Sequence, residues 1–263
     1  MNIATRLPTL FLSHGSPMLA VEDSPAGRFL DGLGAQLPRP RAIVVASAHF
    51  EVERPSVGAT PHPATVHDFG GFPPELYQIR YPAPGAPELA EDIAGRLSEA
   101  GLAPAIRTNL GLDHGVWVPL RRSYPEADIP VVPLSVNRRA DAAHHFAVGR
   151  ALAPLREQGV LVIGSGGFVH NLGDLDWQHR DAPMPPWASD FAAWMCARLE
   201  AQDIEALLDW ERQAPNPRKA HPTVEHLMPL FVALGAGGES ARVRSLHRSH
   251  EFGSLALDAF SFE

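Results

Sequence analysis

The chain has 263 residues, 45% hydrophobic and 20% charged, a composition typical of a globular protein with a full core in one large or two small domains. Its net charge of −8 argues against a nucleic-acid binder, which needs basic patches, and no apolar run approaches the roughly 20 residues of a membrane span. The first residues lack the apolar core of a signal peptide, and the single cysteine, Cys196, excludes an internal disulfide. We therefore expect a cytoplasmic protein.

Short buried strands alternate with amphipathic helices along the chain. The predicted strands are residues 10–12, 42–49, 129–136 and 160–165, with a last one at the sheet edge over 254–262. The predicted helices are residues 24–36, 87–100, 140–158, 187–201 and 204–210, one from 222 to about 235, and a short one after the loop that starts at 110. This order predicts a single α/β domain over 1–263, with a central, largely parallel or mixed sheet flanked by helices.

Residues 51–87 interrupt this alternation with a long segment rich in proline and aromatic residues. Long irregular segments inside compact domains are usually functional or disordered, and the aromatic residues argue against disorder. We interpret this segment as an ordered loop that covers a site. His67, Phe69, Phe72 and Tyr77 are the side chains that we expect to reach a substrate there.

Three predicted strands run directly into a histidine, at His14, at His49 and near His170. Open α/β sheets bind their ligands at the carboxyl ends of the strands, so the repetition indicates a site there. His14 and His49 follow consecutive strands, which we expect to be neighbours in the sheet. Because neutral imidazoles bind Zn, Fe, Cu and Ni, a metal site is the leading interpretation. The alternative is that each histidine only forms hydrogen bonds within its loop.

A third metal ligand has to come from further along the chain. Glu225 and His226 are the leading candidates, and we place both in the first turns of the helix that starts at Pro222. Adjacent helical residues point about 100° apart, so only one of the two is expected to face the site.

His114 and His170 form a second pair with a different role. Histidine titrates near neutral pH, so two of them beside a metal are suited to moving protons. Asp113 precedes His114 and either assists it or caps a turn or helix. A serine-hydrolase elbow at Ser165 is poorly supported because Ile163 occupies the place of the first glycine, and no P-loop or dinucleotide fingerprint is present.

Six motifs occur in order along the chain: LSHGSP at 12–17, SAHF at 47–50, HDFGGFP at 67–73, LDHG at 112–115, GSGGFVHN at 164–171 and HPTVEH at 221–226. Together they resemble the class III extradiol ring-cleavage dioxygenases, and within them the DOPA-4,5-dioxygenase type branch of the LigB-like superfamily. The resemblance extends from residue 8 to about 262.

This resemblance implies a mononuclear non-haem Fe(II) site, although some bacterial members are associated with Zn(II). By motif, His14 and His49 match the two metal histidines. The third ligand is a glutamate in more distant members, whereas in this branch the matching place is His226, with Glu225 as the alternative.

The resemblance also assigns the proton chemistry and the substrate. His170 matches the acid–base histidine, and Asp113 with His114 matches the pair that assists it. The implied reaction opens the ring of a small aromatic diol, a DOPA-like catechol, with O₂ to give a semialdehyde, without a nucleic-acid or membrane partner. Because three histidines are also a common catalytic zinc set, a zinc-dependent hydrolase and a non-catalytic metal-binding protein on the same scaffold stay open. The sequence leaves the oligomeric state open as well.

Overall fold

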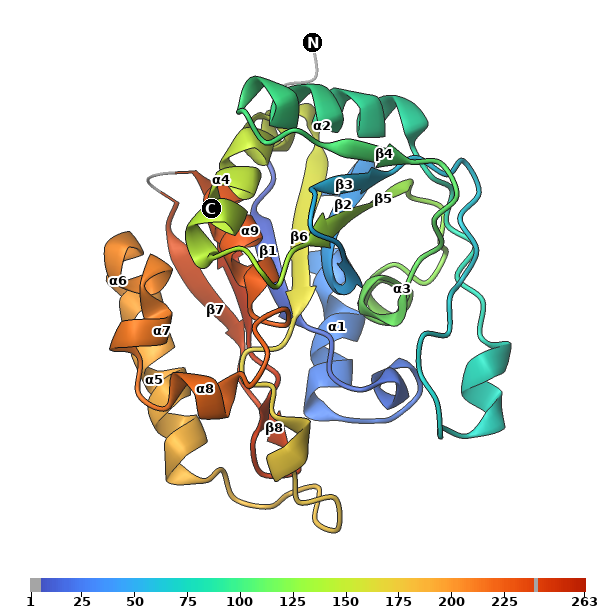
Figure 1. Cartoon of the computed structure of the whole chain (residues 1–263). Coiled ribbons are helices and arrows are strands. Elements are labelled where there is room, and N and C mark those ends of the chain that lie inside the picture. The colour runs from blue at the N-terminus through green and yellow to red at the C-terminus, as the bar shows by residue number, and fades with distance from the viewer. Residues whose placement is uncertain (1–5, 239–240) are drawn as a thin grey trace.

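The computed structural model describes residues 6–238 and 241–263, and a mixed eight-stranded sheet runs through its centre (Figure 1). The strand order is β4-β3-β5-β2-β6-β1-β10-β7. The four central strands, β5, β2, β6 and β1, are parallel, and antiparallel pairing begins on either side of them. The strands are β1 (Thr9–Ser13), β2 (Ala42–Glu51), β3 (Ser56–Gly58), β4 (Ala105–Arg107), β5 (Val131–Val136), β6 (Val160–Gly166), β7 (Val243–His247) and β10 (Ala259–Phe262), with a separate hairpin of β8 (His250–Glu251) and β9 (Leu255–Ala256).

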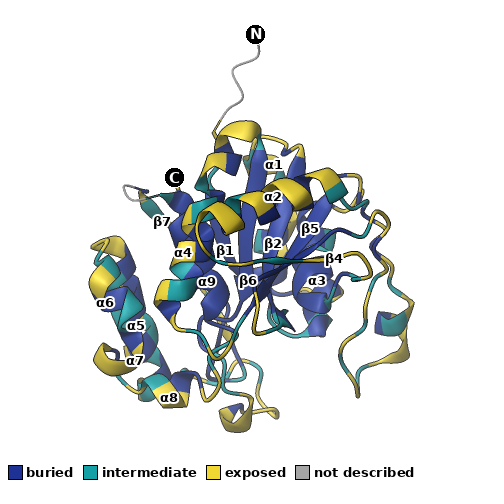
Figure 2. Ribbon diagram, turned by 45° about the horizontal axis from the view of Figure 1, so that its top comes forward, coloured by how far each residue is buried: buried dark blue, intermediate teal, exposed yellow. Residues whose placement is uncertain are grey.

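Helices cover both faces of the sheet, and their buried sides face it (Figure 2). On one face lie α1 (Pro25–Gln36) and α3 (His114–Ser123), and on the other lie α2 (Pro87–Glu99), α4 (Ala142–Leu152) and α9 (Met228–Gly237). A further group stands beside the sheet: α5 (Pro186–Glu200), α6 (Ile204–Leu208), α7 (Trp210–Gln213) and α8 (Pro217–Ala220). The 3₁₀ turns are η1 (Pro17–Ala20), η2 (Pro74–Gln78), η3 (Ala153–Gln158) and η4 (Leu172–Asp174).

Strand β2 shows how the sequence builds these two layers. Its side chains alternate between the faces: Ile43 and Val45 pack in the cluster with α1 and α3, whereas Val44 and Ala46 pack in the cluster with α2, α4 and α9. All four are fully buried, as expected of a parallel strand covered on both sides. None of the helices in the described part of the chain combines the length and apolarity needed to cross a bilayer.

The predicted fold class is confirmed, as are the predicted strands at the centre of the sheet. The predicted cap of α1 is present too, because the Ser24 hydroxyl accepts a hydrogen bond from the Gly27 amide at 3.0 Å. The helix predicted over 140–158 instead ends at Leu152 and continues as the 3₁₀ turn η3, where Pro154 cannot donate the helical hydrogen bond.

The prediction that β1 and β2 are neighbours is wrong. Strand β6 lies between them and pairs in parallel with both, through registers such as Leu12 with Ser165 and Ser47 with Ser165. Local sequence order could not reveal that a strand more than a hundred residues later enters this gap. Because all three strands are parallel, their carboxyl ends still meet at one edge.

The helix predicted from Pro222 begins six residues later, at Met228. Pro229 is the proline in its first turn, where its missing N–H is tolerated, whereas Glu225 and His226 lie in the turn before the helix. The prediction that both are helix-borne is therefore wrong.

The last strand is also shorter and more central than predicted. Strand β10 covers Ala259–Phe262 and lies between β1 and β7, so the edge is formed by β7, which the sequence did not reveal. The Pro-rich segment 51–87, predicted to be a loop, also contains the strand β3 of the central sheet and the 3₁₀ turn η2.

Candidate active site

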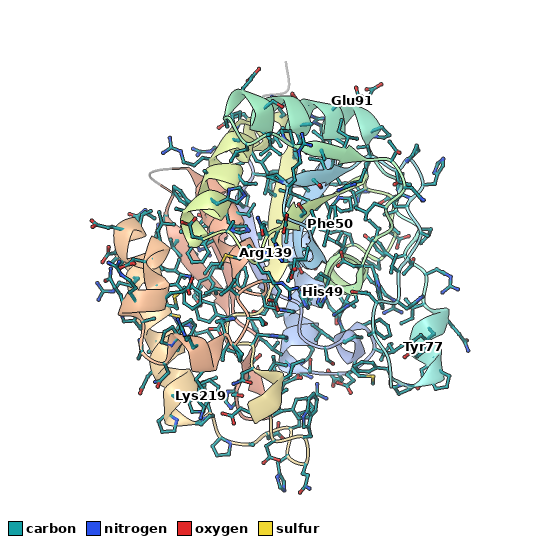
Figure 3. All side chains as sticks on the ribbon, in the orientation of Figure 1. His49, Phe50, Tyr77, Glu91, Arg139 and Lys219 are labelled. Atoms are coloured by element: carbon teal, nitrogen blue, oxygen red, sulfur yellow. The ribbon has the colours of Figure 1, made fainter. Side chains whose placement is uncertain are left out.

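Three histidines from distant parts of the chain meet at the carboxyl edge of the parallel strands. His14 follows β1 directly, His49 lies near the end of β2, and His226 lies in the turn before α9. One ring nitrogen of each lies within 4.8 Å of the others, and the Nε2 atoms of His14 and His49 are 3.0 Å apart. Figure 3 shows His49 near the lower ends of the central strands. The structure thus brings together the three side chains expected to bind a metal.

Two of these imidazoles have a hydrogen-bond acceptor at Nδ1, and Nδ1 of the third, His49, lies 3.6 Å from the Asp68 carboxylate. The hydroxyl of Ser165 donates to the carbonyl of Gly115, so its oxygen accepts from Nδ1 of His14 at 3.0 Å. Nδ1 of His226 donates to the Glu225 carboxylate at 3.0 Å. Such outer partners fix the tautomer of a ligating histidine and leave the Nε2 lone pair free. Glu225 is therefore placed to orient His226.

The turn that carries His226 is held against the end of β6. The amide of Gly167 donates to the carbonyl of His226 at 2.8 Å. A Cβ atom added at Gly166 would lie 2.0 Å from the same carbonyl oxygen, so only glycine permits this approach. The glycines before His170 therefore serve to seat His226, a role that their position in the sequence did not reveal.

The donor set fits a bound divalent metal. Nε2 of His226 is buried and has no hydrogen-bond partner among the described residues, which is costly unless another group fills that place. Burial, followed by the neighbouring His114, lowers the pKa of His49 to about 3, and burial also holds the pKa values of His14 and His226 well below their ordinary value. The three rings are thus neutral, the form in which imidazole binds metals.

His114 is held by Asp68, a residue that the sequence analysis missed. The Asp68 carboxylate accepts from the backbone N–H of His114 and from its Nδ1 atom, both at 2.9 Å. Burial is the largest single effect and opposes ionisation of Asp68, but the hydrogen bonds from His114 and the electrostatic attraction of His114 and His49 together outweigh it and lower the pKa of Asp68 to about 2. The signal in the sequence was its position in the HDFGGFP motif, directly beside His67 and Phe69.

Asp113 makes different contacts. Its carboxylate accepts from the Ser47 hydroxyl at 2.6 Å and from the Val116 amide at 3.2 Å, which makes it the N-cap of α3. Burial raises the pKa of Asp113 to about 6. The carboxylate on the His114 ring is therefore that of Asp68, and Asp113 orients the start of the helix that carries His114.

His170 stacks face to face on His226, with ring centroids 3.5 Å apart and planes inclined by 7°. Its backbone amide donates to Ala220 at 3.0 Å, which ties it to the same side of the site. Burial lowers the pKa of His170 to about 4. A ring nitrogen of His170 also lies within 4.8 Å of one ligand atom each from Glu225 and His226.

A cavity of about 210 Å³ opens onto these histidines. Beyond the five imidazoles and the short stretch Gly15, Ser16 and Pro17, the walls are apolar, and three segments supply them. They are Phe69 and Phe72 from the covering loop, Leu172, Leu175 and Trp177 from the segment around η4, and Phe252 and Leu255 from the β8–β9 hairpin.

The other two residues expected to bind substrate stand behind the cavity wall. Nε2 of His67 lies 3.1 Å from the carbonyl of Ile79, and its ring meets Phe69 edge-on at 5.7 Å. The ring of Tyr77 lies 5.3 Å from that of Phe69, and Figure 3 shows Tyr77 on the outlying turn η2, away from His49. Both side chains support Phe69, whereas Phe69 and Phe72 line the cavity itself.

Comparison with known proteins identifies the family. The family model described as the catalytic LigB subunit of aromatic ring-opening dioxygenase matches residues 8–256. The chain belongs to the LigB family.

The similarity of this LigB protein to its relatives extends along nearly the whole chain. It is 42% identical over 259 residues to the 4,5-DOPA dioxygenase extradiol of Beta vulgaris, a match that covers 97% of this chain and 96% of that one. It is 41% identical over 260 residues to the protein of the same name from Escherichia coli (strain K12), covering 97% and 94%. The crystal structure of an uncharacterized Escherichia coli K12 protein superposes with a TM-score of 0.84 at 36% identity, covering 98% and 100%.

This LigB protein is therefore an extradiol dioxygenase that opens aromatic rings. The enzymes of the family depend on a metal, and the cluster of His14, His49 and His226 is able to bind one.

Proposed function

We propose that the enzyme opens the ring of a catechol that carries a carbon substituent, with O₂ as the co-substrate and a ring-opened semialdehyde as the product. The proposed metal is a single Fe(II) ion held by His14, His49 and His226. The observation that carries this assignment is the buried Nε2 of His226, which finds no partner in the part of the chain that the structure describes and lies beside the His14–His49 pair. The name shared by the relatives from Beta vulgaris and Escherichia coli makes DOPA the first catechol to test.

When bound, a divalent iron would supply the Lewis acidity that lowers the pKa of a catechol hydroxyl and the redox activity that ring opening by O₂ requires. The chain's own contribution begins with orientation. Ser165 and Glu225 hold His14 and His226 so that their Nε2 atoms face one point. Because their tautomers are already fixed, the two histidines need not reorganise when the metal binds.

We assign the proton transfers to His114 and His170, which both line the cavity. Nδ1 of His114 donates to Asp68, so its Nε2 carries the lone pair and can accept a proton from a catechol hydroxyl. His170 is neutral at pH 7 because burial lowers its pKa, so it too is prepared to act first as a base and then to return the proton. The His114 ring lies 3.9 Å from that of His49, whereas His170 stacks on His226 at 3.5 Å, so the two bases stand beside different proposed ligands and each can serve a different hydroxyl of the catechol.

Phe69 and Phe72 form the wall of the covering loop. Their rings meet edge-on with centroids 5.3 Å apart, and the ring of Phe69 also meets that of His114 edge-on at 5.7 Å. An aromatic substrate ring gains contact with both, while the loop excludes bulk water from the reacting atoms.

The decisive experiment loads the anaerobically purified protein with Fe(II) and measures O₂ uptake with L-DOPA, 4-methylcatechol and catechol. We expect one O₂ to be consumed per catechol, together with a yellow ring-opened product. The matched control is His226→Ala treated in the same way, which should show neither. Absence of O₂ uptake with every catechol in an iron-replete preparation would overturn the proposal.

The three-histidine donor set also favours Zn(II), since this is a common catalytic zinc set. Zinc has no redox chemistry, so a zinc-loaded protein should bind catechols without consuming O₂. If the zinc form instead hydrolyses ester or amide substrates that the iron form leaves intact, a hydrolase would replace the dioxygenase as the proposed activity. If neither form turns over any substrate, a metal-binding role would remain.

A further inference from the structure

The cavity has two chemically distinct ends, and the outer one has no established role. The inner end consists of imidazoles, where the diol of a catechol belongs under the proposed function. The outer end is formed by Leu172, Leu175, Trp177, Phe252 and Leu255, of which Leu172 and Trp177 are exposed at the protein surface. Resting on that proposed function, we propose that this end binds the ring substituent, and that the preferred substituent is apolar and uncharged, such as a short alkyl or alkenyl chain, rather than an amino-acid side chain.

The first argument is the exposure of large apolar groups at the opening. Trp177 is 62% exposed and Leu172 is 52% exposed, the two highest values among the exposed large hydrophobic residues of the described chain. The Trp177 ring lies 5.3 Å from that of Phe252, so the two form one continuous apolar rim. A contiguous exposed apolar patch beside a cavity is typical of a binding surface.

The second argument is the charge of the walls. Among the described residues that line the cavity, none is Asp, Glu, Lys or Arg. Two cations on the adjoining segments, Arg180 and Lys219, are already paired: Arg180 with Glu22 at 2.8 Å and with Glu251 at 2.7 Å, and Lys219 with Asp174 at 3.1 Å.

The acidic groups nearest the histidines are engaged as well. Asp68 accepts from His114, and Glu225 accepts from His226. A carboxylate or ammonium on the substituent would therefore have to lose water without gaining an ionic partner, which is unfavourable. A hydrocarbon chain would instead bury apolar surface, at about a fourfold gain in affinity for each buried methylene.

Two catechols of similar shape isolate the effect of charge: 4-propylcatechol and 3-(3,4-dihydroxyphenyl)propionate. Calorimetric titration of each into the zinc-loaded protein measures binding without turnover. We expect 4-propylcatechol to bind at least tenfold more tightly than the carboxylate, and more tightly than dopamine and L-DOPA. With the iron-loaded enzyme, kcat/KM should follow the same order.

Three variants connect this preference to the rim. Trp177→Ala should lower the ratio of kcat/KM for 4-propylcatechol to kcat/KM for unsubstituted catechol about tenfold. Leu172→Arg should narrow or reverse the preference, because the new guanidinium should strengthen binding of the catechol that carries a carboxylate. The matched control is Ile106→Ala, which removes an exposed apolar side chain from β4. Because all three side chains are exposed, folding is expected to be unaffected.

The outcomes separate this inference from the proposed function. If the charged catechols bind as tightly as 4-propylcatechol or are turned over faster, the apolar-substituent assignment is overturned while the dioxygenase activity stands. If no catechol is turned over by the iron form, the proposed function fails, and the binding order on the zinc form still decides the nature of the subsite.

Discussion

The carboxylate of Asp68 holds the imidazole of His114 from a position 46 residues earlier in the chain. One oxygen accepts from the backbone N–H and the other from Nδ1, so both the ring and its helix are tied to the covering loop. The same loop carries Phe69 and Phe72, which line the cavity. The position of the loop at the cavity and the tautomer of His114 are therefore set together.

Asp68→Asn tests this relationship. With one amide oxygen still accepting from the His114 backbone, the NH₂ group would face Nδ1 and favour the tautomer that carries its proton on Nε2. His114 could then no longer accept a proton, so we expect kcat to fall by on the order of 10²-fold or more. Bound iron should stay near one per chain, measured by elemental analysis. Asp92→Asn, which removes a carboxylate bonded to Arg96 on α2, is the control; equal kcat in both variants would contradict the role of Asp68.

Replacing a proposed ligand histidine by alanine should have a different effect on metal content from replacing His170. His14→Ala, His49→Ala and His226→Ala each delete a proposed ligand and should lower the bound metal to well under half of the wild-type content. His170→Ala should retain the metal and lose turnover, because its ring stacks on His226 and serves proton transfer. Elemental analysis and O₂ uptake measure the two effects separately, with the exposed His179→Ala as control. Metal loss from His170→Ala equal to that from His14→Ala would make His170 a ligand.

Ser165→Ala removes the acceptor that orients His14. Its ring would then be free to change tautomer and to turn, and loss of such an outer partner typically lowers metal affinity 10–100-fold. Competition with a chelator of known affinity measures this change. Ser189→Ala, which removes a hydroxyl from the exposed part of α5, should leave the affinity unchanged. An unaltered affinity in Ser165→Ala would mean that packing alone orients His14.

Asp258 provides a prediction on pH and stability away from the metal site. Burial raises its pKa to about 7, although Arg248 lies 3.8 Å away and favours the charged form. A carboxyl with a raised pKa binds its proton more tightly in the folded state. Its contribution to stability is therefore full below pH 4 and is lost as the pH rises to 7.

Asp258→Asn abolishes that loss. The difference in the free energy of unfolding, variant minus wild type, should therefore increase by roughly 1–3 kcal/mol between pH 4 and pH 8. Urea unfolding of the metal-free proteins at several pH values measures the difference, and the histidines common to both proteins cancel. Asp190→Asn, on the exposed side of α5, should show no such trend. A difference that is flat with pH would show that Asp258 is ionised in the fold across this range.

The amino-acid sequence by itself determined the local elements and the kind of chemistry. The apolar run before His14, the Ser24–Pro25 start of α1 and the near-continuous hydrophobic stretch of β2 are local patterns, and the structure confirms each of them. The repeated placement of a histidine at the end of a strand indicated a metal site before any geometry was known. The six motifs indicated the family because each one is a contiguous stretch of sequence and can be recognised without knowledge of the fold.

Only the tertiary structure decided the arrangement between distant segments. It placed β6 between β1 and β2, moved the start of α9 beyond His226, and brought Asp68 rather than Asp113 onto the His114 ring. It also put His67 and Tyr77 behind Phe69 instead of in the cavity. Strand pairing, a carboxylate's choice of partner and the closeness of Gly166 to His226 depend on contacts between residues far apart in the chain, and periodicity and spacing carry no information about which of those contacts form.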